Sequence, residues 1–258
     1  MRVTWRGVGC LAFGFMLACT TTGEPELRQA RAHRNLAALY LSRSQNEIAI
    51  REYRMALKLD DSDPESHFGI AEAYRRKDES VLAEKHFRIA LRRDPTMLDA
   101  RLNLGALFIG EGRWEEAIQE NRILLEDPTF LLPERALVNM GWAEYKSGDL
   151  RAAEAHYRQA IESNTRSLRA HLNLGIVFYD RGEFVDAVTE LEAVLEILRD
   201  RPPGPFAAVE AQARFRLGKA YIELGQRDRA LKQLKVASER GGAGEWGERS
   251  RDYLRVID

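Results

Sequence analysis

The amino-acid sequence predicts an all-α fold, a superhelix of six helix-turn-helix units followed by one further helix. Three observations predict it. Small residues recur at intervals of 34 to 43 residues. A second set of small residues follows the first at a constant distance of 12 positions. An aromatic or large apolar residue comes three or four places after each member of the first set. A helix pair of this size cannot bury its apolar face alone, so it is stable only when the units stack.

The two sets of small residues define the register of the units. The first set, in the first helix, is Ala37, Ala71, Gly105, Gly141, Gly175 and Gly218. The second set, in the second helix, is Ala49, Ala83, Ala117, Ala153, Ala187 and Ala230. The steps between units are therefore 34, 34, 36, 34 and 43 residues. We expect the small residue of the first helix to face the alanine of the second, so that the two axes approach closely. The aromatic or large residues, expected to fill the gap between units, are Tyr40, Tyr74, Phe108, Tyr145, Phe178 and Tyr221.

Turn-forming residues set the bounds of the units. Glycines that tolerate a left-handed backbone follow several first helices, and proline or aspartate ends several second helices. The resulting units are 30–63, 64–97, 98–131, 134–167, 168–201 and 211–244. Two extra residues separate units three and four. Nine separate units five and six, where Pro202, Pro203 and Pro205 break the helix and a longer first helix restarts from Phe206. Residues 245–258 are expected to form a C-terminal capping helix with Trp246 on its apolar face.

The N-terminus has the pattern of a secretory signal. Arg2 and Arg6 precede a short apolar run, 8–18, which ends in small residues. The run has about 11 residues, whereas a membrane-spanning helix needs about 20. The sequence therefore predicts a signal peptide over 1–18 that is removed.

The end of that run, Met16-Leu17-Ala18-Cys19, resembles a bacterial lipobox. The resemblance implies that Cys19 carries fatty acyl chains such as palmitate and becomes the first residue, with 19–29 as lipidated cysteine and tether. Met16 departs from the more usual leucine. Thr20 is not the aspartate of an inner-membrane retention signal, which favours an outer-membrane address with the repeats in the periplasm. The alternative is an ordinary signal peptide with an incidental cysteine. Cys10 would leave with the signal, so we expect no disulfide in the mature chain.

The composition argues against nucleic-acid binding and catalysis. The net charge is −1 with 31% charged residues, whereas nucleic-acid binders show a basic bias. Three histidines, His33, His67 and His171, share one place in the unit, which indicates repeat register and not a metal site. Residues 60–63 lack the glycine and glutamate of a calcium loop. Neither a phosphate loop nor a nucleophile elbow is present. We expect no enzyme activity, no cofactor, no metal and no nucleic-acid partner.

The register as a whole resembles the tetratricopeptide repeat, over residues 30–244. The best single match begins at Asn139-Met140-Gly141-Trp142-Ala143-Glu144-Tyr145 and runs through Ala160. Unit three departs from the pattern, because Asn121 and Leu124 stand where an aromatic residue and an alanine are usual. We therefore expect looser helix packing in that unit.

The tetratricopeptide resemblance also implies a concave groove. In that family the second, fifth, sixth, ninth, twelfth and thirteenth places of each unit line it. In units three to five the fifth, ninth and twelfth places are all apolar or aromatic: Leu102, Ala106, Ile109, Val138, Trp142, Tyr145, Leu172, Ile176 and Tyr179. The sixth places, where an asparagine can bind a peptide or simply pack, are Asn103, Asn139 and Asn173. Units one and two are charged at several of these places.

An apolar stripe with aromatic anchors is typical of a partner-binding surface. We expect an apolar or amphipathic segment to lie there, not an acidic tail, with Trp142, Tyr145 and Tyr179 as anchors. The alternative is that these residues pack against neighbouring units or the capping helix. The basic residues Arg227, Arg229, Lys232 and Lys235 of unit six are expected on a solvated outer face.

The layout of lipobox, tether and six repeats resembles the outer-membrane lipoproteins of type IV pilus biogenesis, the PilF/PilW type, which includes the myxobacterial Tgl proteins. That resemblance implies a pilotin, a lipid-anchored protein that binds outer-membrane secretin subunits, promotes their multimer assembly and so supports twitching or social gliding motility. The alternative function is a general periplasmic scaffold or adaptor lipoprotein for cell-envelope enzymes.

Overall fold

The computed structural model describes residues 23–201 and 204–257, and the predicted signal peptide and Cys19 lie outside these residues. The described residues form thirteen α-helices, which confirms the all-α prediction. The helices are α1 (Glu24–Ser42), α2 (Asn46–Leu59), α3 (Pro64–Arg75), α4 (Ser80–Arg93), α5 (Leu98–Gly110), α6 (Trp114–Glu126), α7 (Pro133–Ser147), α8 (Leu150–Ser163), α9 (Leu168–Asp180), α10 (Phe184–Arg199), α11 (Ala207–Glu223), α12 (Arg227–Gly241) and α13 (Glu245–Ile257).

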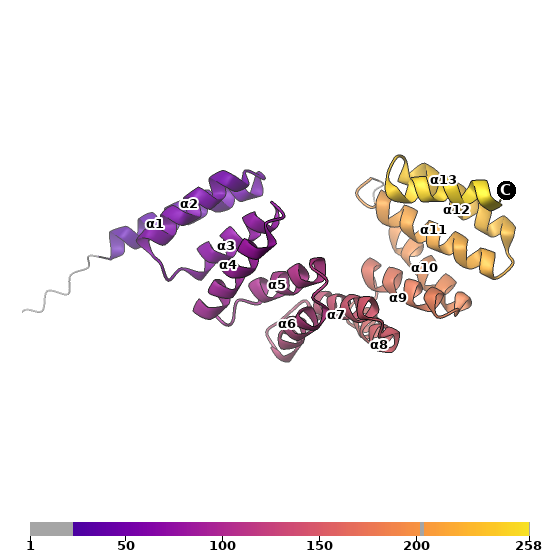
Figure 1. Cartoon of the computed structure of the whole chain (residues 1–258), viewed down its shortest axis with the longest axis horizontal. Helices are drawn as coiled ribbons and strands as arrows, with labels where there is room; N and C mark the ends of the chain where they lie inside the picture. Colours follow the sequence, from indigo (N-terminus) through magenta and orange to yellow (C-terminus); the bar gives the residue numbers. More distant parts are fainter. Residues whose placement is uncertain (1–22, 202–203, 258) are drawn as a thin grey trace, which may run out of the picture.

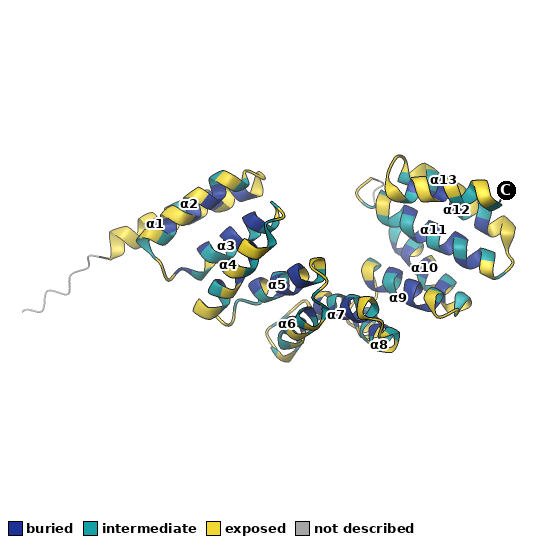
Figure 2. Cartoon of the chain, viewed as in Figure 1, coloured by how far each residue is buried: buried dark blue, intermediate teal, exposed yellow. Residues whose placement is uncertain are grey.

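The helices form six consecutive pairs and a final helix, as the register predicts. Each pair packs within itself, and its second helix packs on the first helix of the next pair. The pairs follow one another along a curved path from α1 to α13 (Figure 1). Burial is concentrated where neighbouring helices face one another (Figure 2). None of the helices in residues 23–201 and 204–257 is long and apolar enough to cross a bilayer.

In units three to six, close contact within a pair depends on a glycine of the first helix. A Cβ atom added at Gly141 would lie 2.7 Å from Cε1 of Tyr157, and one added at Gly218 would lie 2.7 Å from Cγ of Leu234. The carbonyl oxygen of Ala230 is farther from that same point, at 3.3 Å. The prediction of close approach is therefore correct. The glycine also accommodates the large side chain one turn after the alanine, which the register did not predict.

Unit three places a polar side chain where the other units place a large apolar or aromatic one. Asn121 is fully buried, at the place occupied by Leu191 in unit five and Leu234 in unit six. Its Nδ2 donates a hydrogen bond to the carbonyl oxygen of Ala117 (2.7 Å), and its Oδ1 accepts one from Nδ2 of Asn139 (3.2 Å). A buried amide needs such partners. The polar pair therefore interrupts the apolar core of unit three.

Insertions and the first helix shift some of the predicted bounds. The helix α1 begins at Glu24, so residues 24–29 of the predicted tether are helical. The helix α11 begins at Ala207, before the predicted start of unit six at residue 211, and it agrees with the predicted longer first helix. The extra residues before α7 leave Leu131 exposed.

The two ends of the stack differ in how they are covered. The helix α13 packs on α12 and α11, with Trp246 and Tyr253 against a cluster around Phe215. At the other end, Leu36 and Leu39 of α1 are 39% and 44% exposed. The corresponding residues of unit three, Leu104 and Leu107, are 1% and 6% exposed. Within the described residues, the chain therefore covers its C-terminal end and leaves the apolar face of its first helix open.

Candidate partner-binding site

The first helices of units three to six line an open hollow of about 640 Å³, which we call the groove. Its walls are mainly apolar. Seven of the twelve predicted partner-binding residues line it: Ala106, Ile109, Val138, Trp142, Leu172, Asn139 and Asn173. The other lining residues are Leu168, Arg169, Phe206, Val209 and Gln212. The groove thus crosses four consecutive units and takes side chains from α5, α7, α9 and α11.

Four of the twelve predicted partner-binding residues are buried. Leu102, Val138, Leu172 and Ile176 are between 2% and 6% exposed and belong to the hydrophobic core between units. Leu102 and Ile176 do not line the groove. They pack between neighbouring units, which is the alternative to partner binding given for these residues in the sequence analysis. Val138 and Leu172 form the floor of the groove. Asn103, which is half-buried, does not line it.

Trp142 is the most prominent aromatic residue of the groove. Its ring stacks on that of Tyr145, with 5.4 Å between centroids and 30° between planes. The ammonium group of Lys146 lies 5.6 Å from the centroid of the Trp142 ring. Both contacts hold the indole in place while leaving it half-buried. A side chain held in this way can contact a partner at little cost in conformational entropy.

The two predicted tyrosine anchors already use their hydroxyl groups. The hydroxyl of Tyr145 donates a hydrogen bond to Oδ2 of Asp180 (2.7 Å), and that of Tyr179 donates one to Oε1 of Glu223 (3.4 Å). Burial and the neighbouring carboxylate raise the pKa of each tyrosine to about 12, so both stay neutral donors near pH 7. In both pairs the tyrosine is at the twelfth place of one unit and the carboxylate at the thirteenth of the next. These residues tie consecutive first helices together and offer mainly ring faces to a partner.

Five lining residues were not among those predicted. Arg169 and Gln212 occupy the second place of their units, which the family pattern includes, so the register could have found them. Leu168 occupies a first place, which is outside that pattern. Phe206 and Val209 precede the predicted start of unit six and reach the groove because α11 is extended at its N-terminal end. The insertion before α11 is the signal in the sequence that points to them.

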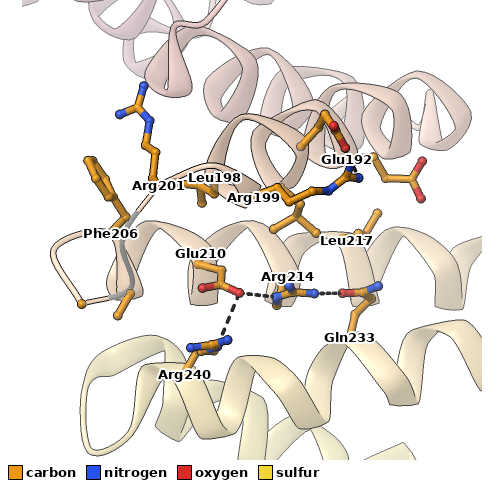
Figure 3. Close-up of a pocket in the computed structure, with 14 residues that line it drawn as sticks. Glu192, Leu198, Arg199, Arg201, Phe206, Glu210, Arg214, Leu217, Gln233 and Arg240 are labelled. Carbon is orange, nitrogen blue, oxygen red and sulfur yellow. Dashed lines mark hydrogen bonds and ion pairs between the residues drawn. The ribbon is translucent and has the colours of Figure 1, made fainter.

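A second hollow, of about 660 Å³, lies between α10, α11 and α12 (Figure 3). Several of its charged and polar side chains pair with one another. Arg214 donates hydrogen bonds to Oε1 of Glu210 (2.9 Å) and Oε1 of Gln233 (2.8 Å), and Nε of Arg240 lies 3.6 Å from Oε1 of Glu210. Because these charges are satisfied within the hollow, the groove is the better candidate for a partner.

The histidines follow the repeat register. His33 and His171 each place Nδ1 within hydrogen-bonding distance of a glutamate 19 residues later, Glu52 at 2.9 Å and Glu190 at 2.6 Å. At the same two places unit two has His67 and His86, whose Nδ1 atoms are 3.1 Å apart. The part of the chain that the structure describes contains no group of three side chains suited to hold a metal ion.

Comparison with protein families identifies the repeat. A model described as tetratricopeptide repeat matches residues 68–129 and 138–205, which together make up half of the chain. Two more models, described as TPR repeat and tetratricopeptide repeat, match residues 37–78 and 212–240. The chain belongs to the tetratricopeptide repeat family, whose members are typically non-catalytic scaffolds for protein partners.

Solved structures show the same fold in pilus biogenesis factors. The chain is similar to the PilF structure from Pseudomonas aeruginosa, with 20% identity, a TM-score of 0.71 and coverage of 89% of this chain and 100% of that one. It is similar to PilW, a widely conserved type IV pilus biogenesis factor, with 21% identity, a TM-score of 0.73 and coverage of 84% and 96%. MamA is less similar, with 24% identity, a TM-score of 0.54 and coverage of 69% and 91%. No curated protein matches the sequence significantly.

Proposed function

We propose that this chain is an outer-membrane lipoprotein that acts as a pilotin. It binds secretin subunits of the type IV pilus system through the groove and promotes their assembly into multimers. The observation that carries the proposal is an apolar groove that crosses four units and has the half-buried ring of Trp142 in its wall. The fold shared with PilF and PilW supports it.

The mechanism is temporary shielding of an apolar segment. A secretin subunit crosses the periplasm before its membrane-embedded surfaces have lipid or a neighbouring subunit to contact. Burying such a surface yields about 25 cal/mol per Å² of apolar area, so a groove of mixed aliphatic and aromatic side chains holds it without a covalent step. Contact with neighbouring subunits buries more area than the groove does, and the segment then leaves it.

In this proposal the lipid on Cys19 tethers the first helix close to the membrane. Four residues, 20–23, separate Cys19 from the first residue of α1. An extended residue spans at most about 3.6 Å, so α1 starts within roughly 20 Å of the lipid. Cys19→Ser should move the full-length protein out of the membrane fraction, whereas Cys10→Ser is the matched control and should leave it there. Membrane association of Cys19→Ser would overturn the anchoring role.

The binding role is tested at Trp142. In cells whose secretin assembly depends on this protein, Trp142→Glu should reduce the amount of secretin multimer and leave secretin monomers. Immunoblotting of outer membranes measures both forms. Trp142→Phe keeps an aromatic surface and should retain most of the multimers. Val185→Glu is the matched control, because Val185 is 65% exposed on α10 and lies outside the groove.

The purified Trp142→Glu protein should melt at the wild-type temperature, which separates a binding defect from misfolding. Normal multimers in cells carrying this variant would overturn the pilotin proposal. Co-purification of cell-wall hydrolases or synthases with the wild-type chain, and not of secretin, would favour the scaffold alternative.

A further inference from the structure

The groove adjoins a third hollow along α11. Gln212 of this helix lines the groove, and Arg216 and Lys219 follow within the next two turns. Those two residues line a hollow of about 420 Å³ together with Phe215, Tyr253, Val256, Arg249 and Asp252. The helix α11 therefore lines both the apolar groove and a hollow with basic side chains. A single extended or helical segment of a partner can contact both.

Arg216 and Lys219 have no carboxylate partner among the described residues. The guanidinium group of Arg216 lies 5.8 Å from the centroid of the Trp246 ring, and its Nε atom is buried without a hydrogen-bond partner. The ammonium group of Lys219 lies 4.7 Å from the centroid of the Tyr179 ring. Burial and then the charge of Arg216 lower the pKa of Lys219. Buried polar donors are normally satisfied, so the lack of a partner for Nε of Arg216 is unusual.

The nearby carboxylates are engaged elsewhere. Asp180 accepts the hydrogen bond of Tyr145, and Glu223 accepts that of Tyr179. Asp252 pairs with Arg255 at 3.1 Å. The third cation of the hollow, Arg249, lies 3.4 Å from Glu245. Neither cation on α11 therefore has an ion-pair partner in this hollow, although Asp180 and Glu223 lie close enough to act electrostatically on Lys219.

We propose that Arg216 and Lys219 form an anion subsite that binds one carboxylate of the segment held in the groove. This inference rests on the proposed function and adds to it, because it gives the partner an apolar stretch followed by an aspartate or glutamate. Guanidinium groups bind carboxylates through paired hydrogen bonds, and lysine adds a point charge. Asp180, Glu223 and Asp252 nearby disfavour a doubly charged phosphate, so a peptide carboxylate is the better match.

The test compares two fluorescein-labelled peptides on the full-length protein. Both carry the same run of leucine and isoleucine, and it is followed in one by two aspartates and in the other by two asparagines, with amidated ends. We expect the aspartate peptide to bind about fivefold to tenfold more tightly at low salt, measured by fluorescence anisotropy. In Arg216→Gln/Lys219→Gln this preference should fall to nearly none, with the asparagine peptide unaffected.

A matched variant controls for total charge. Lys232→Gln/Lys235→Gln removes the same charge from exposed sites on α12 and should keep the preference. Arg216→Glu/Lys219→Glu should reverse the preference and favour a peptide that ends in two lysines, a gain that a misfolded protein cannot show.

The outcomes separate the two proposals. Equal binding of the two peptides to the wild-type protein overturns the anion subsite and leaves the groove intact. A preference that survives in Arg216→Gln/Lys219→Gln also overturns the subsite. Binding of neither peptide overturns the subsite and the binding role of the groove together.

Discussion

The hydroxyl group of Tyr145 lies 2.7 Å from Oδ2 of Asp180, a residue of the next unit that is 35 positions later in the sequence. Tyr179 and Glu223 repeat the same arrangement one unit later, at 3.4 Å. The surface that lines the candidate site therefore also holds consecutive units at a fixed spacing. The bond geometry indicates that Tyr145–Asp180 is the stronger of the two.

Tyr145→Phe should lower the free energy of unfolding by about 1 kcal/mol, the usual net value of a partly exposed hydrogen bond. Asp180→Asn should lower it by a similar amount. Because the two side chains contact each other, the double variant should lose less than the sum of the single losses. Urea unfolding of the four proteins measures this coupling. Strict additivity would show that the bond contributes nothing to stability.

Asn121→Leu should stabilise the protein. Units five and six already carry leucine at this place opposite a glycine, so the side chain fits unit three. Replacing a satisfied buried amide by an apolar group of similar size is neutral or favourable. Asn139, which loses its partner, is half-exposed and can contact water. We expect a gain of about 1 kcal/mol, or a melting temperature higher by about 2–4 °C. A lower melting temperature would mean that Asn139 needs Asn121 for its position.

His86 should make the protein less stable in mild acid. Burial and the nearby His67 lower the pKa of His86 to about 4, below the unfolded value of about 6.5. As the pH falls from about 6.5 to about 4, the unfolded chain gains a proton at this site while the folded chain does not, so stability is lost in that window. His86→Gln should therefore lose less stability than the wild type between pH 7.5 and pH 5, measured by urea midpoints.

His171 provides a control of opposite sign. Its hydrogen bond to Glu190 raises the pKa of His171, so its contribution is fully present below the unfolded pKa and is lost as the pH rises through the folded value. His171→Gln should lose more stability than the wild type on going from pH 7.5 to pH 5. The same response in both variants would refute the assignment of the acid effect to individual histidines.

Trp246→Ala should loosen the C-terminal end of the stack only. The indole lies 5.7 Å from the Phe215 ring and packs α13 on α11 and α12. In a repeat protein each unit contacts only its neighbours, so the loss should remain local. Hydrogen exchange should speed up in α11–α13 and stay unchanged in α1–α4. Val256→Ala is the control on the same helix, since Val256 is 82% exposed. Uniform acceleration along the whole chain would contradict this.

The sequence was sufficient for the pairing of helices, because the small residues of the register determine where two helices can approach. The sequence was less informative about which of the predicted groove residues are buried and which are exposed. Leu102 and Ala106 occupy neighbouring turns of the same helix face, yet Leu102 is buried and Ala106 exposed. Their burial depends on the angle between consecutive units, which is set by side chains of both units and does not follow from the pattern of one. The contribution of Phe206 depends on an insertion that no register predicts.

The polar interruption at Asn121 also divides the apolar core. One cluster extends from Ala37 to Ala143, and the next begins at Leu137, with a small separate group around Leu102 and Leu124 between them. We call this boundary between units three and four the joint. The groove crosses the joint, with Ile109 on one side and Trp142 on the other. An occupant of the groove would therefore contact units on both sides of the joint at once.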